Sequence, residues 1–138
     1  MELGIVAGDG RAEALSELDH RADAAAVCQR PIDLVHLARY TMGNKALERE
    51  ILDLFVGQAC VTLSRLEAAS TDKEWRDQAH ALLGSARAVG AKRVADRVLV
   101  AQRLPGGPAA PGRADVIAAI AAELDTANRY IRDLFPEE

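Results

Sequence analysis

The stretch TDKEWRDQAHALLGSARAVGA, residues 71–91, contains most of the information about the fold of this chain. Its first residues, Thr71 and Glu74, have the spacing of a capping box, which predicts the start of a helix. Apolar residues then recur at three- and four-residue steps, the pattern of a helix with one buried face: Trp75, Ala79, Leu82, Leu83 and Ala86. Gly90 is the residue type that commonly follows the end of a helix. The stretch therefore predicts a helix over residues 72–89.

The residues before this stretch predict two more helices. Asp33 is a suitable N-cap for a short helix, whose apolar residues and aromatic residue are Leu34, Leu37 and Tyr40. Gly43 and Asn44 then break the chain. A long helix is predicted over residues 45–68 because apolar residues again recur at helical spacing: Leu47, Ile51, Leu54, Phe55, Ala59, Leu63 and Leu66.

The residues after the stretch predict two further helices, over residues 91–103 and 114–135. A loop rich in proline and glycine separates them at residues 105–112. Pro136 stops the last helix, since proline cannot continue one. The apolar residues of these helices are Ala91, Val94, Ala95, Val98 and Leu99 in the first, and Val116, Ile120, Leu124, Ala127, Ile131 and Leu134 in the second.

Four helices of useful length with mostly short links favour an all-α fold, an antiparallel four-helix bundle with a short leading helix across one end. We expect the bundle to occupy residues 30–138, with Trp75, Leu82 and Phe55 in its core. Residues 1–29 begin with several glycines and continue as an Ala-rich, polar stretch. We expect them to be an N-terminal extension that is loosely ordered or partly helical.

The composition of the chain excludes several classes of protein. A net charge of −4 over 138 residues, with no stripe of Lys and Arg, argues against nucleic acid as a partner. No apolar run approaches the roughly 20 residues of a membrane helix, and no signal peptide is recognisable. Cys28 and Cys60 have no metal-ligand spacing, and we expect buried or half-buried thiols in a reducing compartment. These features predict a cytoplasmic protein.

His80 is the candidate functional residue. On a helical wheel at about 100° per residue, it falls well outside the apolar arc of its helix, so it should face solvent. Gly84 lies one turn further on and clears space for a bulky partner, at a cost of about 1 kcal/mol in helix stability relative to alanine. Arg87, two turns on, is placed to offer charge to a phosphoryl oxygen. An exposed imidazole is a nucleophile near neutral pH.

Gln102 is expected at a similar height on the neighbouring helix. His80 precedes Gly90 by ten residues and Gln102 follows it by twelve, so an antiparallel hairpin brings the two side chains to one level. Gln102 falls on the inward face of its helix. There it could hydrogen-bond one imidazole nitrogen and present the other outward.

This segment resembles the signature of histidine-containing phosphotransfer (HPt) domains. That signature is His-x-Leu-Lys-Gly-Ser, followed by a small residue and by a Gly-Ala pair that closes the helix. The helix layout from Asp33 to the final helix is also similar. The residues that match the signature are His80, Leu82, Gly84, Ser85, Ala86, Gly90 and Ala91.

The resemblance implies a phosphorelay intermediate of two-component signalling. His80 would accept a phosphoryl group on Nε2 from the aspartate of a receiver domain and pass it to another receiver. The carrier would bind no ATP and no cofactor, and it would not be an enzyme. Its partners would be response-regulator receivers and a hybrid histidine kinase. Gln102 lies where the family often has a polar residue near the histidine.

One residue departs from the family pattern. The lysine that normally follows the histidine by three residues is Leu83 here. Arg87 is the first candidate to supply the missing charge, and Arg76 is the second. We expect Leu83→Lys to leave the fold intact and to change the rate of transfer.

Partner docking should use a few apolar anchors and a basic rim. The candidate docking residues are Leu83, Tyr40, Met42 and Arg76, and the candidate rim consists of Arg87, Lys92, Arg93 and Arg97. No kinase or receiver motif accompanies the bundle, so we expect the protein to depend on partners in trans. We also expect it to be a monomer.

Two alternatives remain open from the sequence. The first is an HPt-like module that docks on a receiver or kinase without accepting phosphate, since the lysine is missing. The second is a metal-binding helical bundle, because a carboxylate precedes each histidine by three residues, at Glu17 and His20, Asp33 and His36, and Asp77 and His80. Asp77 and His80 are predicted to point outward, which disfavours this alternative. His20 and His36 are otherwise expected to be structural or surface residues.

Overall fold

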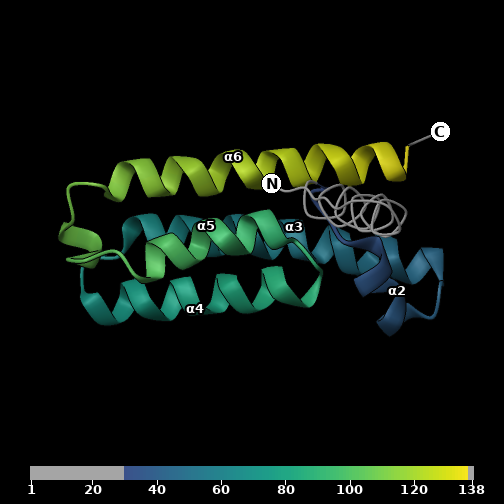
Figure 1. Cartoon of the computed structure of the whole chain (residues 1–138), viewed down its shortest axis with the longest axis horizontal. Coiled ribbons are helices and arrows are strands. Elements are labelled where there is room, and N and C mark those ends of the chain that lie inside the picture. The colour runs from purple at the N-terminus through teal and green to yellow at the C-terminus, as the bar shows by residue number, and fades with distance from the viewer. Residues whose placement is uncertain (1–29, 137–138) are drawn as a thin grey trace, which may run out of the picture. The chain divides into compact units, whose positions relative to one another are not determined.

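A computed structural model describes residues 30–136 of the chain, and this part is all-helical (Figure 1). It contains five α-helices and one 3₁₀ turn, and no strand occurs within it, which confirms the all-α prediction. The elements are α2 (Leu34–Thr41), α3 (Lys45–Ala68), α4 (Asp72–Ala88), α5 (Lys92–Gln102), η1 (Gly107–Ala109) and α6 (Arg113–Leu134). The extension predicted over residues 1–29 lies outside the described residues.

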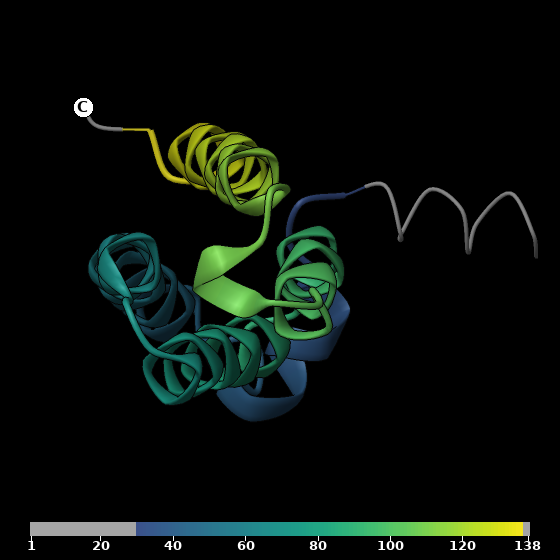
Figure 2. The ribbon, with the colours of Figure 1, turned by 90° about the vertical axis from the view of Figure 1, so that its left-hand side faces the viewer.

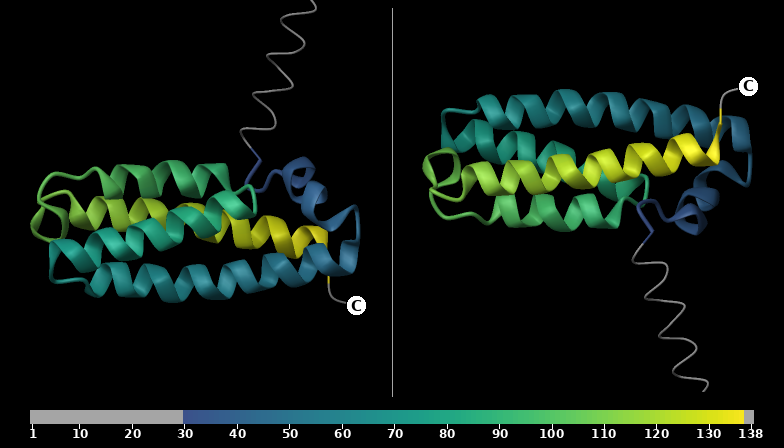
Figure 3. Two further views of the ribbon diagram at one scale, coloured as in Figure 1. Left: turned by 90° about the horizontal axis from the view of Figure 1, so that it is seen from below. Right: turned by 90° about the horizontal axis from the view of Figure 1, so that it is seen from above.

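The four long helices lie side by side, and each contacts two others. α3 packs on α4 and α6, and α5 packs on the same two helices from the other side. The end-on view shows the four axes arranged around a common interior (Figure 2). The short helix α2 packs on α3 and lies at one end of the long helices (Figure 3).

The interior between these helices is filled by apolar side chains. Trp75, Leu82 and Phe55 are 1%, 0% and 4% exposed, which confirms the predicted core residues. The indole nitrogen of Trp75 donates a 2.8 Å hydrogen bond to the carbonyl oxygen of Ala101, so its one polar group is satisfied. The guanidinium of Arg113 lies 5.9 Å from the Trp75 ring. These contacts tie α4 to α5 and α6.

The start of α3 differs from its predicted apolar face. Leu47 and Leu54 are 38% and 61% exposed, whereas Leu52 is buried at 0% and Glu48 at 2%. The predicted face was therefore wrong at these positions. A pattern of apolar residues does not indicate a buried carboxylate, so the predicted apolar face included Leu47 and Leu54 and omitted Glu48.

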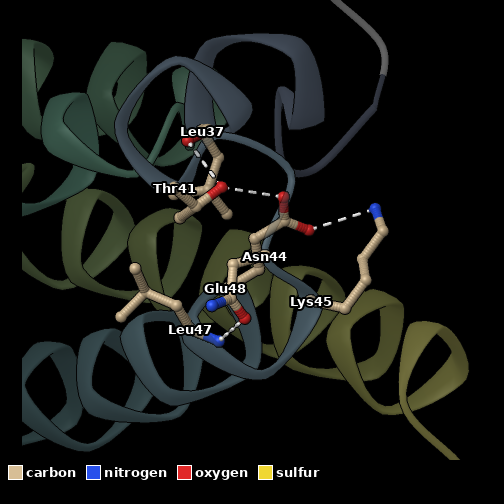
Figure 4. Close-up of polar contacts among 6 residues, drawn as sticks. All are labelled: Leu37, Thr41, Asn44, Lys45, Leu47 and Glu48. Atoms are coloured by element: carbon tan, nitrogen blue, oxygen red, sulfur yellow. Dashed lines mark hydrogen bonds and ion pairs between the residues drawn. The ribbon is translucent and has the colours of Figure 1, made fainter.

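Glu48 is buried because its carboxylate has two partners at the α2–α3 corner (Figure 4). The hydroxyl of Thr41 donates a 2.9 Å hydrogen bond to one oxygen, and the ammonium of Lys45 lies 3.2 Å from the other. A buried charge is tolerated only when it is paired and hydrogen-bonded in this way. The hydrogen bond between Thr41 and Glu48 thus links the end of α2 to the start of α3.

The helix boundaries agree with the predicted ranges to within one residue. Thr71 and Glu74 form the predicted capping box. Gly90 has a φ of +76°, and a Cβ there would lie 3.0 Å from Asp33 Cβ and from the Asp33 carbonyl oxygen. The Asp33 amide also donates a 2.9 Å hydrogen bond to the Gly90 carbonyl. Only glycine therefore fits the turn between α4 and α5 where α2 begins.

Cys60 is exposed, contrary to the expectation of a buried or half-buried thiol. It follows the buried residue Ala59 on α3, and one step along a helix rotates a side chain by about 100° away from the core. Cys28 lies outside the described residues. Within residues 30–136, no helix combines the length and the apolar character needed to cross a bilayer.

Candidate functional site

His80 lies in the middle of α4 with its side chain exposed. Its neighbours Ala79 and Leu82 are both completely buried, so the core face of α4 turns away from the imidazole. Neither ring nitrogen forms a hydrogen bond or ion pair with any residue in the described part of the chain. Both nitrogens are therefore open to a reactant that arrives from solvent.

Gly84 is exposed one turn after His80, and no feature of the fold requires a glycine there. A Cβ built at this position would meet nothing within 4 Å. Glycine inside a helix costs about 1 kcal/mol relative to alanine. Gly90 is different, since its backbone conformation and the contact with Asp33 both demand glycine. The space above Gly84 is thus accessible to an approaching molecule.

Arg76 and Arg87 lie on α4 on either side of His80, and both are exposed. Neither has an ion-pair or hydrogen-bond partner among residues 30–136. Arg103, directly after Gln102 at the end of α5, is exposed and equally unpaired. The sequence analysis missed Arg103, although its position beside Gln102 was a usable signal. Three guanidinium groups are therefore free to bind an anion on the α4–α5 side.

The other three residues of the predicted basic rim are paired with two acidic side chains. Lys92 pairs with Asp96 at 3.2 Å. Arg93 and Arg97 lie 3.0 Å and 3.5 Å from the two carboxylate oxygens of Glu123 on α6. Only Arg87 among the four predicted rim residues has no such partner. The rim as a whole therefore offers less charge to a partner than the sequence indicated.

Asp77 places a carboxylate close to His80, and a lysine forms an ion pair with this carboxylate. The Lys73 ammonium donates a 2.7 Å hydrogen bond to Asp77 and holds the pKa of that carboxyl below its usual range, with smaller contributions from Arg76 and His80. Asp77 therefore stays ionised and paired with Lys73. Because Asp77 is paired with Lys73, it forms no ion pair with either arginine of α4.

Gln102 is the last residue of α5 and is half-buried, as its inward position predicted. Its side chain makes no hydrogen bond with the His80 ring or with any other described residue. The expected orientation of the imidazole by Gln102 is therefore not present in this structure.

Leu83 belongs to the core and is only 5% exposed. A side chain with so little surface contributes almost nothing to an apolar docking patch, so we remove Leu83 from the candidate docking residues. The expectation that Leu83→Lys leaves the fold undisturbed also changes, because a lysine at this position has to bury its stem and extend its charge out of the core.

Tyr40 and Met42, the other apolar docking candidates, are 67% and 93% exposed at the end of α2. Met42 has a φ of +53°, a left-handed conformation that is uncommon for a residue with a side chain. The Tyr40 ring packs edge-on against His36, with 5.4 Å between ring centroids. His36 and Arg87 both line a hollow of about 280 Å³ between α2, α4 and α5.

The metal-binding alternative finds no support in residues 30–136. No group of three or more His, Cys, Asp or Glu side chains in this range is placed to hold a metal ion. Asp33 uses its carboxylate to cap α2, where it accepts hydrogen bonds from the amides of Val35 and His36. Glu17 and His20 lie outside the described residues.

Comparison with known proteins does not assign this site. No family model matches the chain, and neither a curated protein nor a solved structure matches it.

Proposed function

We propose that the chain is a phosphorelay intermediate of the HPt type, in which His80 carries a phosphoryl group between receiver domains. The observation that supports this best is the exposed imidazole of His80 beside Gly84, a position at which no feature of the fold requires glycine. The proposal includes an antiparallel four-helix bundle as the architecture, with which the contacts of α3, α4, α5 and α6 are compatible. It also places the protein in the cytoplasm with its receivers.

The proposed chemistry is a direct transfer between two side chains. A nitrogen lone pair of His80 attacks the phosphorus of a receiver's aspartyl phosphate. The phosphorus–oxygen bond to the aspartate breaks, the carboxylate leaves, and a phosphorus–nitrogen bond forms. The second transfer reverses these roles with another receiver. No cofactor takes part, and the group that reacts on this chain is the imidazole alone.

Charge stabilisation would come from arginine instead of the family's lysine. Arg87 and Arg76 are exposed on the helix that carries His80, and neither is paired within the described residues. A guanidinium binds phosphoryl oxygens with charge-assisted hydrogen bonds that are about twice as strong as neutral ones. Arg103 is a third candidate from α5.

The test is transfer of labelled phosphate to the full chain from a panel of receiver domains charged with a small acyl phosphate. We expect acid-labile, alkali-stable label on the wild type and on His36→Gln, and none on His80→Gln. Equal labelling of His80→Gln would refute the proposal. If no receiver labels the wild type but one binds it, the protein is better described as a docking module that does not transfer phosphate. The buried Leu83 at the position of the family's lysine favours this alternative.

A further inference from the structure

The described chain has a second helical glycine that neither its backbone conformation nor a close contact requires. Gly57 is in the middle of α3, it is exposed, and a Cβ there would meet nothing within 4 Å. The helix would be more stable with alanine at this position, by about 1 kcal/mol. The same reasoning that makes Gly84 a point of close approach therefore applies to Gly57 on another face of the molecule.

The side chains around Gly57 form what we call the α3 outer face, which consists of Glu50, Leu54, Gly57, Val61 and Arg65. At about 100° per residue these positions fall within roughly 80° of arc, on the side of α3 away from its buried residues. Leu54 is 61% exposed and Val61 is 45% exposed. Two large apolar side chains thus flank the glycine one turn away on either side, and all three are open to solvent.

The charged members of the α3 outer face are also unsatisfied. Glu50 and Arg65 are exposed, and neither has an ion-pair partner within residues 30–136. Four other charged residues of α3 form two ion pairs, Lys45 with Glu48 at 3.2 Å and Arg49 with Asp53 at 3.9 Å. An acidic group near one end of the face and a basic group near the other end thus have no partner in the described part of the chain.

The arrangement of this face is self-complementary. Leu54 and Val61 lie at equal distances in sequence from the bond between Gly57 and Gln58, and so do Glu50 and Arg65. If a second α3 packs antiparallel with its centre at the same point, Leu54 of each copy lies opposite Val61 of the other. Glu50 of each copy then lies opposite Arg65 of the other, and the two glycines meet near the axis.

We infer that the α3 outer face is the interface of a symmetric homodimer, in which two copies of α3 pack antiparallel about Gly57. A two-fold interface requires one patch that is complementary to itself, and the apolar and charged residues of this face are arranged in that way. The absence of a side chain at Gly57 allows the two helices to approach closely at the crossing point. This inference does not depend on the proposed phosphotransfer, and it replaces our sequence-based expectation of a monomer.

The dimer is expected to be weak and to leave the proposed transfer site open. A contact made by one helix from each copy is smaller than a standard stable interface, which predicts a dissociation constant of about 10–100 μM. His80 lies on α4, and the candidate arginines lie on α4 and directly after α5, not on α3. The dimer would therefore present two separate His80 surfaces.

The experiment is sedimentation equilibrium of the full chain at rising concentration. We expect the wild type to shift from monomer to dimer in the range of about 10–100 μM. In the dimer, Glu50→Arg brings two arginines together at both symmetric contacts between positions 50 and 65, and Arg65→Glu brings two glutamates together there. Each variant should therefore weaken the dimer about tenfold. The double variant Glu50→Arg/Arg65→Glu restores opposite charges and should recover the wild-type constant to within about threefold.

Two further variants separate this interface from other causes. Asp133→Arg makes the same charge change at an exposed position of α6 and should leave the dimer constant unchanged. Gly57→Lys places two ammonium groups at the axis and should give a monomer, while circular dichroism shows an intact helical fold. A wild type that stays monomeric up to about 1 mM, or a dimer that the charge reversals do not affect or the double variant does not restore, would overturn the inference.

Discussion

The outer faces of α3 and α4 have one backbone feature in common and differ in their side chains. Each has a helical glycine, Gly57 or Gly84, whose missing Cβ would meet nothing within 4 Å. On α3 the glycine is flanked by exposed apolar residues. On α4 the glycine is preceded by His80 and followed by Arg87, an arginine that is unpaired within residues 30–136. Under our two proposals, each glycine is a point of close approach, and the side chains beside it determine the kind of partner.

This difference separates two kinds of partner. The α4 face has an exposed nucleophile and positive charge, which suit a phosphorylated, acidic partner. The α3 face has apolar surface with one acid and one base in mirror positions, which suits a second copy of itself. A substitution on one face should therefore leave the function of the other unchanged.

The largest effect is expected from Gly84→Leu. The new side chain fills the space beside His80 and keeps the donor's phosphorus from its attacking distance, so transfer should fall about a hundredfold. Helix stability should rise, since leucine is the better helix former. The measurement is the initial rate of phosphate transfer from a charged receiver.

Gly57→Leu is the matched control, because it makes the same change on α3. Its transfer rate should equal that of the wild type. If both variants lose transfer equally, the two faces are not functionally separate.

The next largest effect is expected from lysine substitutions in urea denaturation. Leu83→Lys places a charge at a position that is 5% exposed and should lower the free energy of unfolding by about 2 kcal/mol. Leu54→Lys, at a position 61% exposed, should change it by less than about 0.5 kcal/mol. A Leu83→Lys variant as stable as the wild type would contradict the burial of this position.

Arg87→Gln should lower the transfer rate about tenfold, which corresponds to the loss of one charge-assisted hydrogen bond to a phosphoryl oxygen. Arg65→Gln removes an unpaired arginine from α3 and should have no effect on transfer. A normal rate for Arg87→Gln would shift the role to Arg76 or Arg103, which the corresponding glutamine variants would reveal.

The smallest effect concerns acid stability at the start of α4. The Glu74 carboxylate accepts hydrogen bonds from the Ser70 amide and hydroxyl and from the Thr71 amide, and these lower the pKa of Glu74 below 4.5. Because the folded-state pKa is the lower one, the stabilisation is present above pH 4.5 and is lost as the pH falls through the folded value.

Glu74→Gln should therefore flatten the decrease in melting temperature as the pH falls below 4.5. Glu67→Gln, at an exposed position near the end of α3, is the control and should keep the wild-type slope. A wild-type slope in Glu74→Gln would show that this capping carboxylate does not contribute to acid denaturation.

The sequence predicted the helices well because their signals are local. The capping box at Thr71 and Glu74, the apolar stripe through Trp75 and Leu82, and Gly90 at the turn each depend on residues within a few positions of one another. The pattern failed at the start of α3. There the buried residue is Glu48, and its partner Thr41 belongs to another helix.

The candidate site was predicted in part for the same reason. The exposure of His80 follows from its angle on a single helix, and the sequence determined it. Whether a charged side chain is free to bind a partner does not follow from the sequence of one helix, because it depends on contacts between helices. Arg93 and Arg97 looked free in the sequence, but both are paired with the single carboxylate of Glu123 on α6, which offsets one of their two charges.

The sequence by itself determined that the described chain is helical, where each helix begins and ends, and that His80 points away from the apolar face of its helix. Only the tertiary structure decided that Glu48 is buried, that Arg76, Arg87 and Arg103 have no ion-pair or hydrogen-bond partner within residues 30–136, and that a Cβ at Gly84 or Gly57 would meet nothing within 4 Å. The reason is physical. Helix formation and amphipathicity depend on neighbours along the chain, whereas burial and ion pairing depend on which helices pack together.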